Sequence, residues 1–148
     1  MGTDNSWTLT LAVLRASTAI VDAVQEAVAA AGHTDLRPAH GMVFVHVAAG
    51  EATVVTVAEF LGVSKQAASV LVQYLVDHGY LERVSSPRDG RVRILVLTAA
   101  GRDCTAVAGA AAARLTAEWR EQLGPAEFDV LAQGLAGLTA GAAIRPAW

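Results

Sequence analysis

Apolar residues follow helical spacing through the first part of the chain. They form two adjacent rows over residues 8–31: Leu14, Val21, Val24 and Val28 in one row, and Leu9, Val13 and Ile20 in the other. Gly32 follows as a helix C-cap. A helix with two apolar rows is covered on more than one side. We therefore expect this helix to be buried in an interface between subunits.

The next region predicts a helix-turn-helix. A helix is expected from Pro38 to about Ala49. Thr56 and Glu59 form the T-x-x-E pattern of a capping box at the start of a short helix, which Gly62 ends. Ser64 then caps a helix from Lys65 to His78, closed by Gly79. Two helices joined by a short turn that contains glycine are typical of a helix-turn-helix.

A β-hairpin follows directly. Residues 80–85 predict a short strand, and residues 86–90 (Ser-Pro-Arg-Asp-Gly) are rich in turn formers. From Arg91 to Leu97 the chain alternates, with Val92, Ile94 and Val96 on one face and the arginines on the other. A helix-turn-helix followed by a hairpin is a winged helix.

Helical spacing returns after the hairpin. Thr98 caps a helix expected from about Ala99 to Leu123, and Pro125 opens a last helix after Gly124. The predicted fold is mainly α with a small β-hairpin wing (α+β), in a single domain of residues 1–148. Residues 36–98 form the winged helix-turn-helix lobe, and residues 8–31 and 99–142 form a helical dimerisation region.

Composition excludes several classes of protein. Of the 148 residues, 53% are hydrophobic and 17% charged, which excludes a disordered chain. The longest run without a charge, residues 130–144, is too short to span a membrane. A signal peptide begins with basic residues, and no basic residue precedes Arg15. The single cysteine, Cys104, cannot form an internal disulfide. We therefore expect a soluble cytoplasmic protein without membrane contact.

Charge is distributed unevenly along the chain. The whole sequence has 11 basic and 14 acidic residues, a net charge of −3. Residues 64–102 hold six of the basic and three of the acidic residues, a local charge of +3, which leaves −6 for the remainder. This asymmetry predicts a surface that faces an anion on an otherwise acidic body.

These motifs resemble the multiple antibiotic resistance regulator (MarR) family of winged-helix transcription regulators. The runs TVAEFLGVSKQAASVLVQYLVDHGYLERV (residues 56–84) and RDGRVRILVLTAAG (88–101) resemble its helix-turn-helix and wing, and LGPAEFDVLAQGLAGL (123–138) its last helix. The family often has an arginine where this chain has Val70, and an acidic residue where it has Ser86. The resemblance implies a homodimer that binds palindromic operator DNA, often as a repressor. It also implies release by a small aromatic or anionic effector, or by an oxidant.

Residues of the second helix and the wing are the candidates for DNA contact. A helix fits the major groove, and an arginine at a hairpin tip can enter a narrow minor groove. Gln66 is expected to pair with adenine, Lys65 with guanine or phosphate, and Val70 with a thymine methyl. The full set is Ser64, Lys65, Gln66, Ser69, Val70, Gln73, Arg88, Arg91 and Arg93. Asp89 is expected to structure the wing and to hold Arg91 by a charged hydrogen bond.

Candidates for an effector pocket are weaker. Trp7, His40, Phe44 and His46 are proposed to line it, although a histidine that is half-buried and hydrogen-bonded is the more common case. The histidine and cysteine spacing predicts no metal site, and Cys104 is expected to serve packing. No Gly-rich phosphate loop, G-x-S-x-G motif or catalytic cluster is present, so we expect no cofactor and no enzyme.

Three hypotheses remain. The first is a homodimeric, sequence-specific DNA-binding regulator. The second is a winged-helix protein-interaction module without sequence-specific DNA binding, which the acidic body and the apolar residues of 67–72 make conceivable. The third is an enzyme or ligand carrier, which would need a convergent polar cluster. The local positive charge and the wing arginines favour the first.

Overall fold

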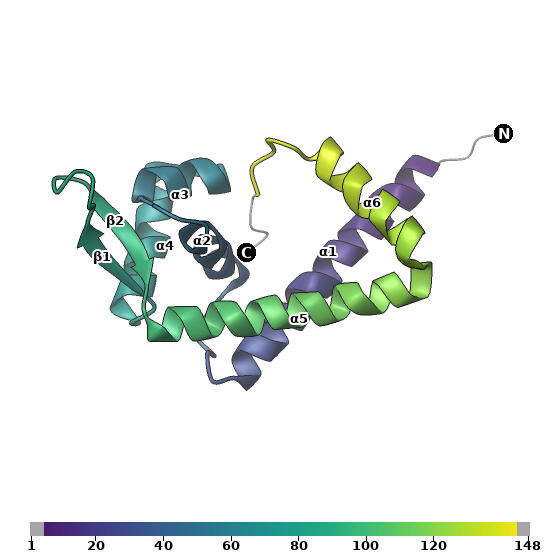
Figure 1. The fold of residues 1–148 in the computed structure, drawn as a ribbon, viewed down its shortest axis with the longest axis horizontal. Coiled ribbons are helices and arrows are strands. Elements are labelled where there is room, and N and C mark those ends of the chain that lie inside the picture. The colour runs from purple at the N-terminus through teal and green to yellow at the C-terminus, as the bar shows by residue number, and fades with distance from the viewer. Residues whose placement is uncertain (1–4, 145–148) are drawn as a thin grey trace.

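The computed structural model describes residues 5–144, which form helices and a small antiparallel hairpin that lies at one end of the molecule (Figure 1). The elements are α1 (Asn5–Ala30), α2 (Pro38–Ala48), α3 (Val54–Leu61), α4 (Lys65–Asp77), β1 (Leu81–Ser85), β2 (Arg93–Leu97), α5 (Ala99–Leu123) and α6 (Pro125–Leu138). This order confirms the predicted mainly α fold with a hairpin wing. Residues 1–4 and 145–148 of the expected domain lie outside the described residues.

The core lies in the winged-helix lobe. Its fully buried side chains come from α2, α3, α4 and the start of β1, among them Val43, Leu61, Leu75 and Leu81. Val28 of α1 and Cys104 of α5 are buried in the same cluster, so the ends of the two long helices are anchored to the lobe. Burial of such side chains stabilises the fold by about 1.5–3 kcal/mol each.

The start of α3 differs from the prediction. Its N-cap is Thr53, whose hydroxyl accepts the Thr56 amide at 3.2 Å, while the Thr56 hydroxyl accepts the Thr53 amide at 2.9 Å. The expected Thr56–Glu59 capping box is therefore wrong, because Thr56 is already the third residue of the helix. The other predicted caps, Ser64 for α4 and Thr98 for α5, are confirmed by their bonds to Ala67 and Gly101.

The wing is a two-stranded sheet with Leu81 opposite Leu97 and Ser85 opposite Arg93. β2 begins at Arg93 rather than Arg91, because the preceding residues belong to the turn. The predicted alternation of β2 is wrong in its buried face: Leu95 is buried, on the same face as Arg93, whereas Ile94 and Val96 are only half-buried and Val92 is exposed. Ala52 forms an isolated bridge to Leu95 and attaches the α2–α3 loop to the sheet.

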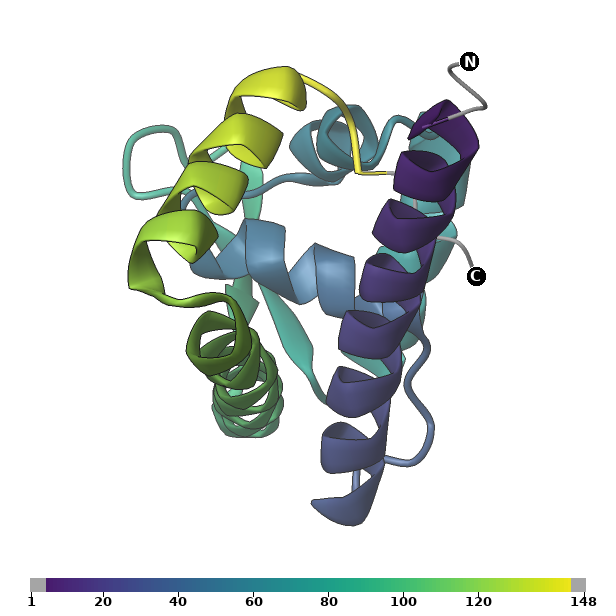
Figure 2. The same ribbon diagram turned by 90° about the vertical axis from the view of Figure 1, so that its right-hand side faces the viewer.

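α5 connects the lobe to the other long helices (Figure 1). α1 crosses and packs against it, and α6 folds back from its far end. In the second view α1 and α6 stand on opposite sides (Figure 2). By length and composition alone, residues 7–30 of α1 would suffice to cross a membrane. The helix nevertheless carries Arg15, Asp22 and Glu26 and buries Val28 in the protein core.

Candidate nucleic-acid interface and internal cavity

α3 and α4 meet in the geometry of a helix-turn-helix. Gly62 ends α3 in the left-handed conformation, with φ of +62°, which glycine adopts without strain. The two helix axes then differ in direction by 114°, within the usual range for this motif. The turn thereby directs α4 across the lobe, with its buried face against α2 and α3.

α4 has one apolar and one polar face. Ala68, Val72 and Leu75 are buried, whereas the predicted contact residues are all exposed: Ser64, Lys65, Gln66, Ser69, Val70 and Gln73. Val70 is a large apolar side chain on the exposed face, with 66% of its surface accessible. The structure therefore brings the six predicted residues of this region together on one outward surface.

The wing turn is held by its own side chains. The Ser86 hydroxyl accepts the amides of Arg88 and Asp89 at 3.2 and 3.4 Å, and an Asp89 carboxylate oxygen accepts the Arg91 amide at 3.0 Å. Asp89 thus structures the wing as expected, but through the main chain of Arg91. In the part of the chain that the structure describes, the Arg91 guanidinium forms no ion pair.

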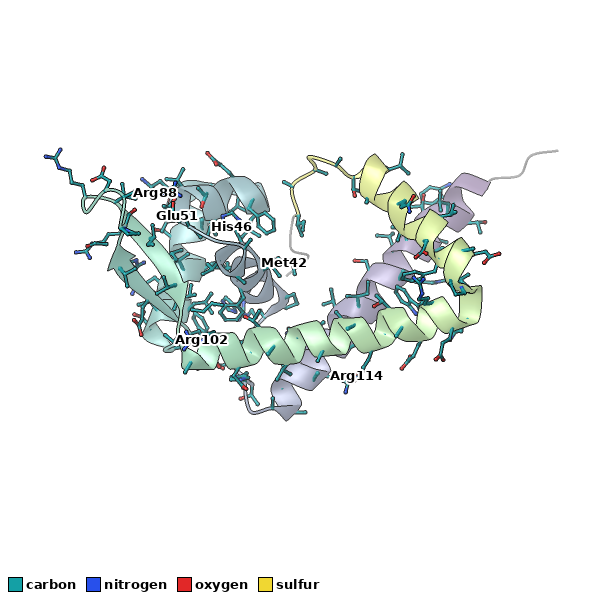
Figure 3. The ribbon with its side chains drawn as sticks, in the orientation of Figure 1. Met42, His46, Glu51, Arg88, Arg102 and Arg114 are labelled. Atoms are coloured by element: carbon teal, nitrogen blue, oxygen red, sulfur yellow. The ribbon has the colours of Figure 1, made fainter. Side chains whose placement is uncertain are left out.

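The other wing arginines contact nearby side chains. Arg88 lies 3.3 Å from the Glu51 carboxylate, which comes from the α2–α3 loop (Figure 3). The Arg88 side chain is 81% exposed, and an exposed pair of this kind stabilises by no more than about 1 kcal/mol. Arg93 donates to the Ser85 hydroxyl at 3.1 Å across the strand pair. These bonds are weak enough to give way to a phosphate.

Arg83 is a cation that the sequence analysis did not single out. It projects from β1 and donates to Oε1 of Gln73 at 3.0 Å, so the wing and the exposed face of α4 form one continuous surface. The period of the strand could have identified it: Arg83 is two residues from the buried Leu81 and therefore lies on the same face of β1. That face meets α4.

Comparison with known proteins agrees with this geometry. Residues 34–92 match the MarR family model. A MarR-family transcriptional regulator from Rhodococcus sp. RHA1 superposes with a TM-score of 0.71 at 20% identity, over 94% of this chain and 99% of that one. The winged-helix lobe of this chain thus matches the MarR family. No curated protein sequence is similar enough to count as a match.

Two further solved structures of similar fold contain a bound ligand or DNA. The transcriptional repressor CouR bound to a 23-mer DNA duplex is 28% identical, with a TM-score of 0.69 over 88% of this chain and 92% of that one. CouR from Rhodococcus jostii RHA1 bound to p-coumaroyl-CoA is 20% identical, with a TM-score of 0.74 over 94% and 96%. At 20% identity, the similarity to the p-coumaroyl-CoA complex shows a shared fold.

A small cavity lies between α1, α2 and α5. Its volume is about 40 Å³, and its wall is mainly apolar, with Arg37 as the one cation. The other lining residues are Val24, Gln25, Val28, Leu36, Gly41, Phe44, Val45, Cys104, Thr105 and Ala108. Burial raises the pKa of the Cys104 thiol to about 11, so this sulfur stays protonated at neutral pH.

Of the four residues predicted to line an effector pocket, only Phe44 borders this cavity. His40 is buried, accepts the Arg37 amide at 3.0 Å and stacks on Tyr74. His46 bonds the Thr56 hydroxyl at 2.9 Å, and Trp7 is 64% exposed on α1. The structure therefore does not bring these four side chains together within one chain.

Proposed function

We propose that the protein is a homodimeric, sequence-specific DNA-binding transcription regulator, with operator repression as its action. The observation that carries this proposal is the continuous polar and cationic surface of α4 and the wing, joined by the Arg83–Gln73 bond. The surface combines a helix that fits a major groove with arginines suited to phosphate or a minor groove. CouR, a repressor solved on DNA, supports the assignment.

The exposed apolar side chains of α1 and α6 support the proposed two-fold symmetry. Within one chain α1 and α6 expose apolar side chains, including Leu9, Leu14, Leu131 and Leu138. A soluble monomer rarely leaves so large an apolar surface uncovered. A two-fold dimer would cover these helices and present two copies of α4 to successive major grooves. We propose a cytoplasmic location and no enzymatic activity for the protein, as the role of a DNA-binding regulator implies.

Effector release is proposed through the cavity between α1, α2 and α5. A cavity of about 40 Å³ is far below the roughly 300–1,000 Å³ that drug-sized ligands occupy. Binding would therefore require the two long helices to separate from α2, and α2 belongs to the DNA-binding lobe. The apolar wall and Arg37 suit an aromatic or acyl anion. CouR bound to p-coumaroyl-CoA supports this chemistry.

Selection of bound fragments from random duplex DNA tests the assignment. We expect enrichment of an inverted repeat whose half-sites lie about one helical turn (~10 bp) apart. Affinity for the selected site should fall steeply as salt rises. Failure to enrich any sequence, even at low salt, would overturn the proposal and favour a protein-interaction module.

A further inference from the structure

Gln73 is the exposed residue of α4 whose side chain is held at both ends. Its Nε2 donates to Oδ1 of Asp77 at 2.6 Å, and its Oε1 accepts from Nη1 of Arg83 at 3.0 Å. A carboxylate accepts hydrogen bonds and cannot donate them, whereas a guanidinium donates hydrogen bonds and cannot accept them. The amide therefore has a single orientation, with its oxygen towards β1 and its nitrogen towards the C-terminal end of α4.

Both ends of this amide retain one hydrogen-bonding position. An amide nitrogen has two hydrogens and its oxygen has two lone pairs, so each partner uses half of the capacity. The outward-facing amide thus offers one acceptor beside one donor. The adenine edge in the major groove offers the complementary pair, the N6 donor and the N7 acceptor.

Asp77 stands in an unfavourable place for a carboxylate. It is the last residue of α4, where the partial negative charge of the helix terminus disfavours an anion, and it adjoins a surface proposed to approach phosphates. The bond to Gln73 is a charge-assisted one at short distance, which compensates for this placement.

We propose that Asp77 and Arg83 are positioning residues that hold the Gln73 amide ready to read an adenine in the major groove. This inference rests on the proposed DNA-binding function and adds the specificity determinant of one operator position. Fixing the amide in advance removes the ordering cost of a flexible side chain on binding. Without the two partners, Gln73 would present either orientation.

Two substitutions of similar shape separate position from charge. Asp77→Asn removes the negative charge and keeps an oxygen that accepts from Gln73, whereas Asp77→Leu removes both. Dissociation constants are measured for the selected operator and for a scrambled duplex. We expect both variants to bind the scrambled duplex more tightly. Specificity is the dissociation constant for the scrambled duplex divided by that for the operator. This ratio should stay near the wild-type value in Asp77→Asn and fall about tenfold in Asp77→Leu.

The same measurements on a Gln73→Ala background provide the control. There the two Asp77 variants should give equal ratios, because the side chain that they position is gone. In the wild type, replacing the contacted adenine by 7-deazaadenine removes N7 and should weaken binding about tenfold, while Gln73→Ala should be insensitive to the replacement. Thermal unfolding verifies that each variant is folded.

The outcomes distinguish this inference from the proposed function. Equal ratios for Asp77→Asn and Asp77→Leu in the presence of Gln73 would overturn the positioning role while operator binding stands. Insensitivity of the wild type to 7-deazaadenine at every adenine of the half-site would overturn the adenine contact. Absence of any selected operator would instead overturn the proposed function itself. Arg83→Met gives a second test, since it should lower the ratio as Asp77→Leu does.

Discussion

Arg91 owes its place at the wing to a bond made by its main chain. Asp89 binds the Arg91 amide at 3.0 Å, and this arrangement leaves the guanidinium exposed. A carboxylate that held the guanidinium itself would neutralise the charge that a phosphate or a minor groove attracts. The main-chain bond therefore structures the turn while leaving the cation available.

Arg91→Ala should weaken operator binding without unfolding the protein. Loss of one DNA-contacting arginine typically costs about 1–3 kcal/mol of binding free energy. Arg114→Ala is the matched control, because Arg114 is exposed on α5, away from the wing (Figure 3). Titration of both variants with the selected operator measures the effect. Equal affinities for Arg91→Ala and wild type would refute the wing contact.

His40 makes stability depend on pH. Burial and the nearby Arg37 charge lower the pKa of His40 from its ordinary value of 6.5. The folded protein therefore holds the imidazole neutral, whereas the unfolded chain takes up a proton near pH 6.5. Its contribution to stability is fully present above that pH and is lost as pH falls below it.

His40→Asn should flatten this dependence. Asparagine retains an acceptor for the Arg37 amide but does not titrate. The decrease in the free energy of unfolding between pH 7 and 5, measured by chemical denaturation, should be smaller in the variant than in the wild type. An unchanged decrease would show that His40 does not contribute to the acid sensitivity of the fold.

At the scale of the elements, local patterns were reliable where local bonds decide the structure. Ser64, Thr98 and Gly62 lie at helix boundaries set by neighbouring residues, and their roles follow from residue type and spacing. The start of α3 depends on a distant contact. Ala52 pairs with Leu95, which holds the chain extended up to Thr53, so the helix starts there.

The start of β2 was mispredicted for a related reason. Arg91 and Val92 continue the alternating pattern of a strand, but the turn uses them first. The Val92 amide donates to the Asp89 carbonyl at 2.9 Å, and the Val92 carbonyl accepts the Ser86 amide at 2.8 Å. The period of the side chains identified which residues share a face of the strand, while the bonds of the turn decided where pairing begins.

Two glycines of α5 should respond oppositely to alanine. A Cβ on Gly101 would collide with the Tyr80 carbonyl oxygen, so this helix can lie against the main chain of Tyr80 only with glycine there. A Cβ on Gly109 would meet nothing within 4 Å. Gly101→Ala should therefore lower the melting temperature, whereas Gly109→Ala should stabilise the helix by up to about 1 kcal/mol. A lower melting temperature in both would contradict this difference.

At the scale of the whole molecule, the fold was predictable and the arrangement of the site only in part. Helical and strand periods identify each element, and the helix-turn-helix determines which face of α4 turns outward. The cavity depends on how α1, α2 and α5 cross, which no local pattern contains. His40 and His46 share α2, yet they face Tyr74 and Phe60 on different helices.

The apolar surfaces of α1 and α6 supply the last prediction, that one substitution on α6 separates the proposed dimer. Leu131, Leu135 and Leu138 lie on an exposed stripe, and Leu138 keeps 86% of its surface accessible in the single chain. Burial of one leucine contributes about 1.5–3 kcal/mol, and a two-fold interface counts it twice. Leu135→Glu should therefore raise the dimer dissociation constant at least about a hundredfold. Val55→Glu, an equivalent change at an exposed position of α3, should leave the dimer intact. Analytical ultracentrifugation measures the dimer dissociation constants of both variants, and circular dichroism verifies that they remain helical. A Leu135→Glu variant that stays dimeric would place the interface elsewhere.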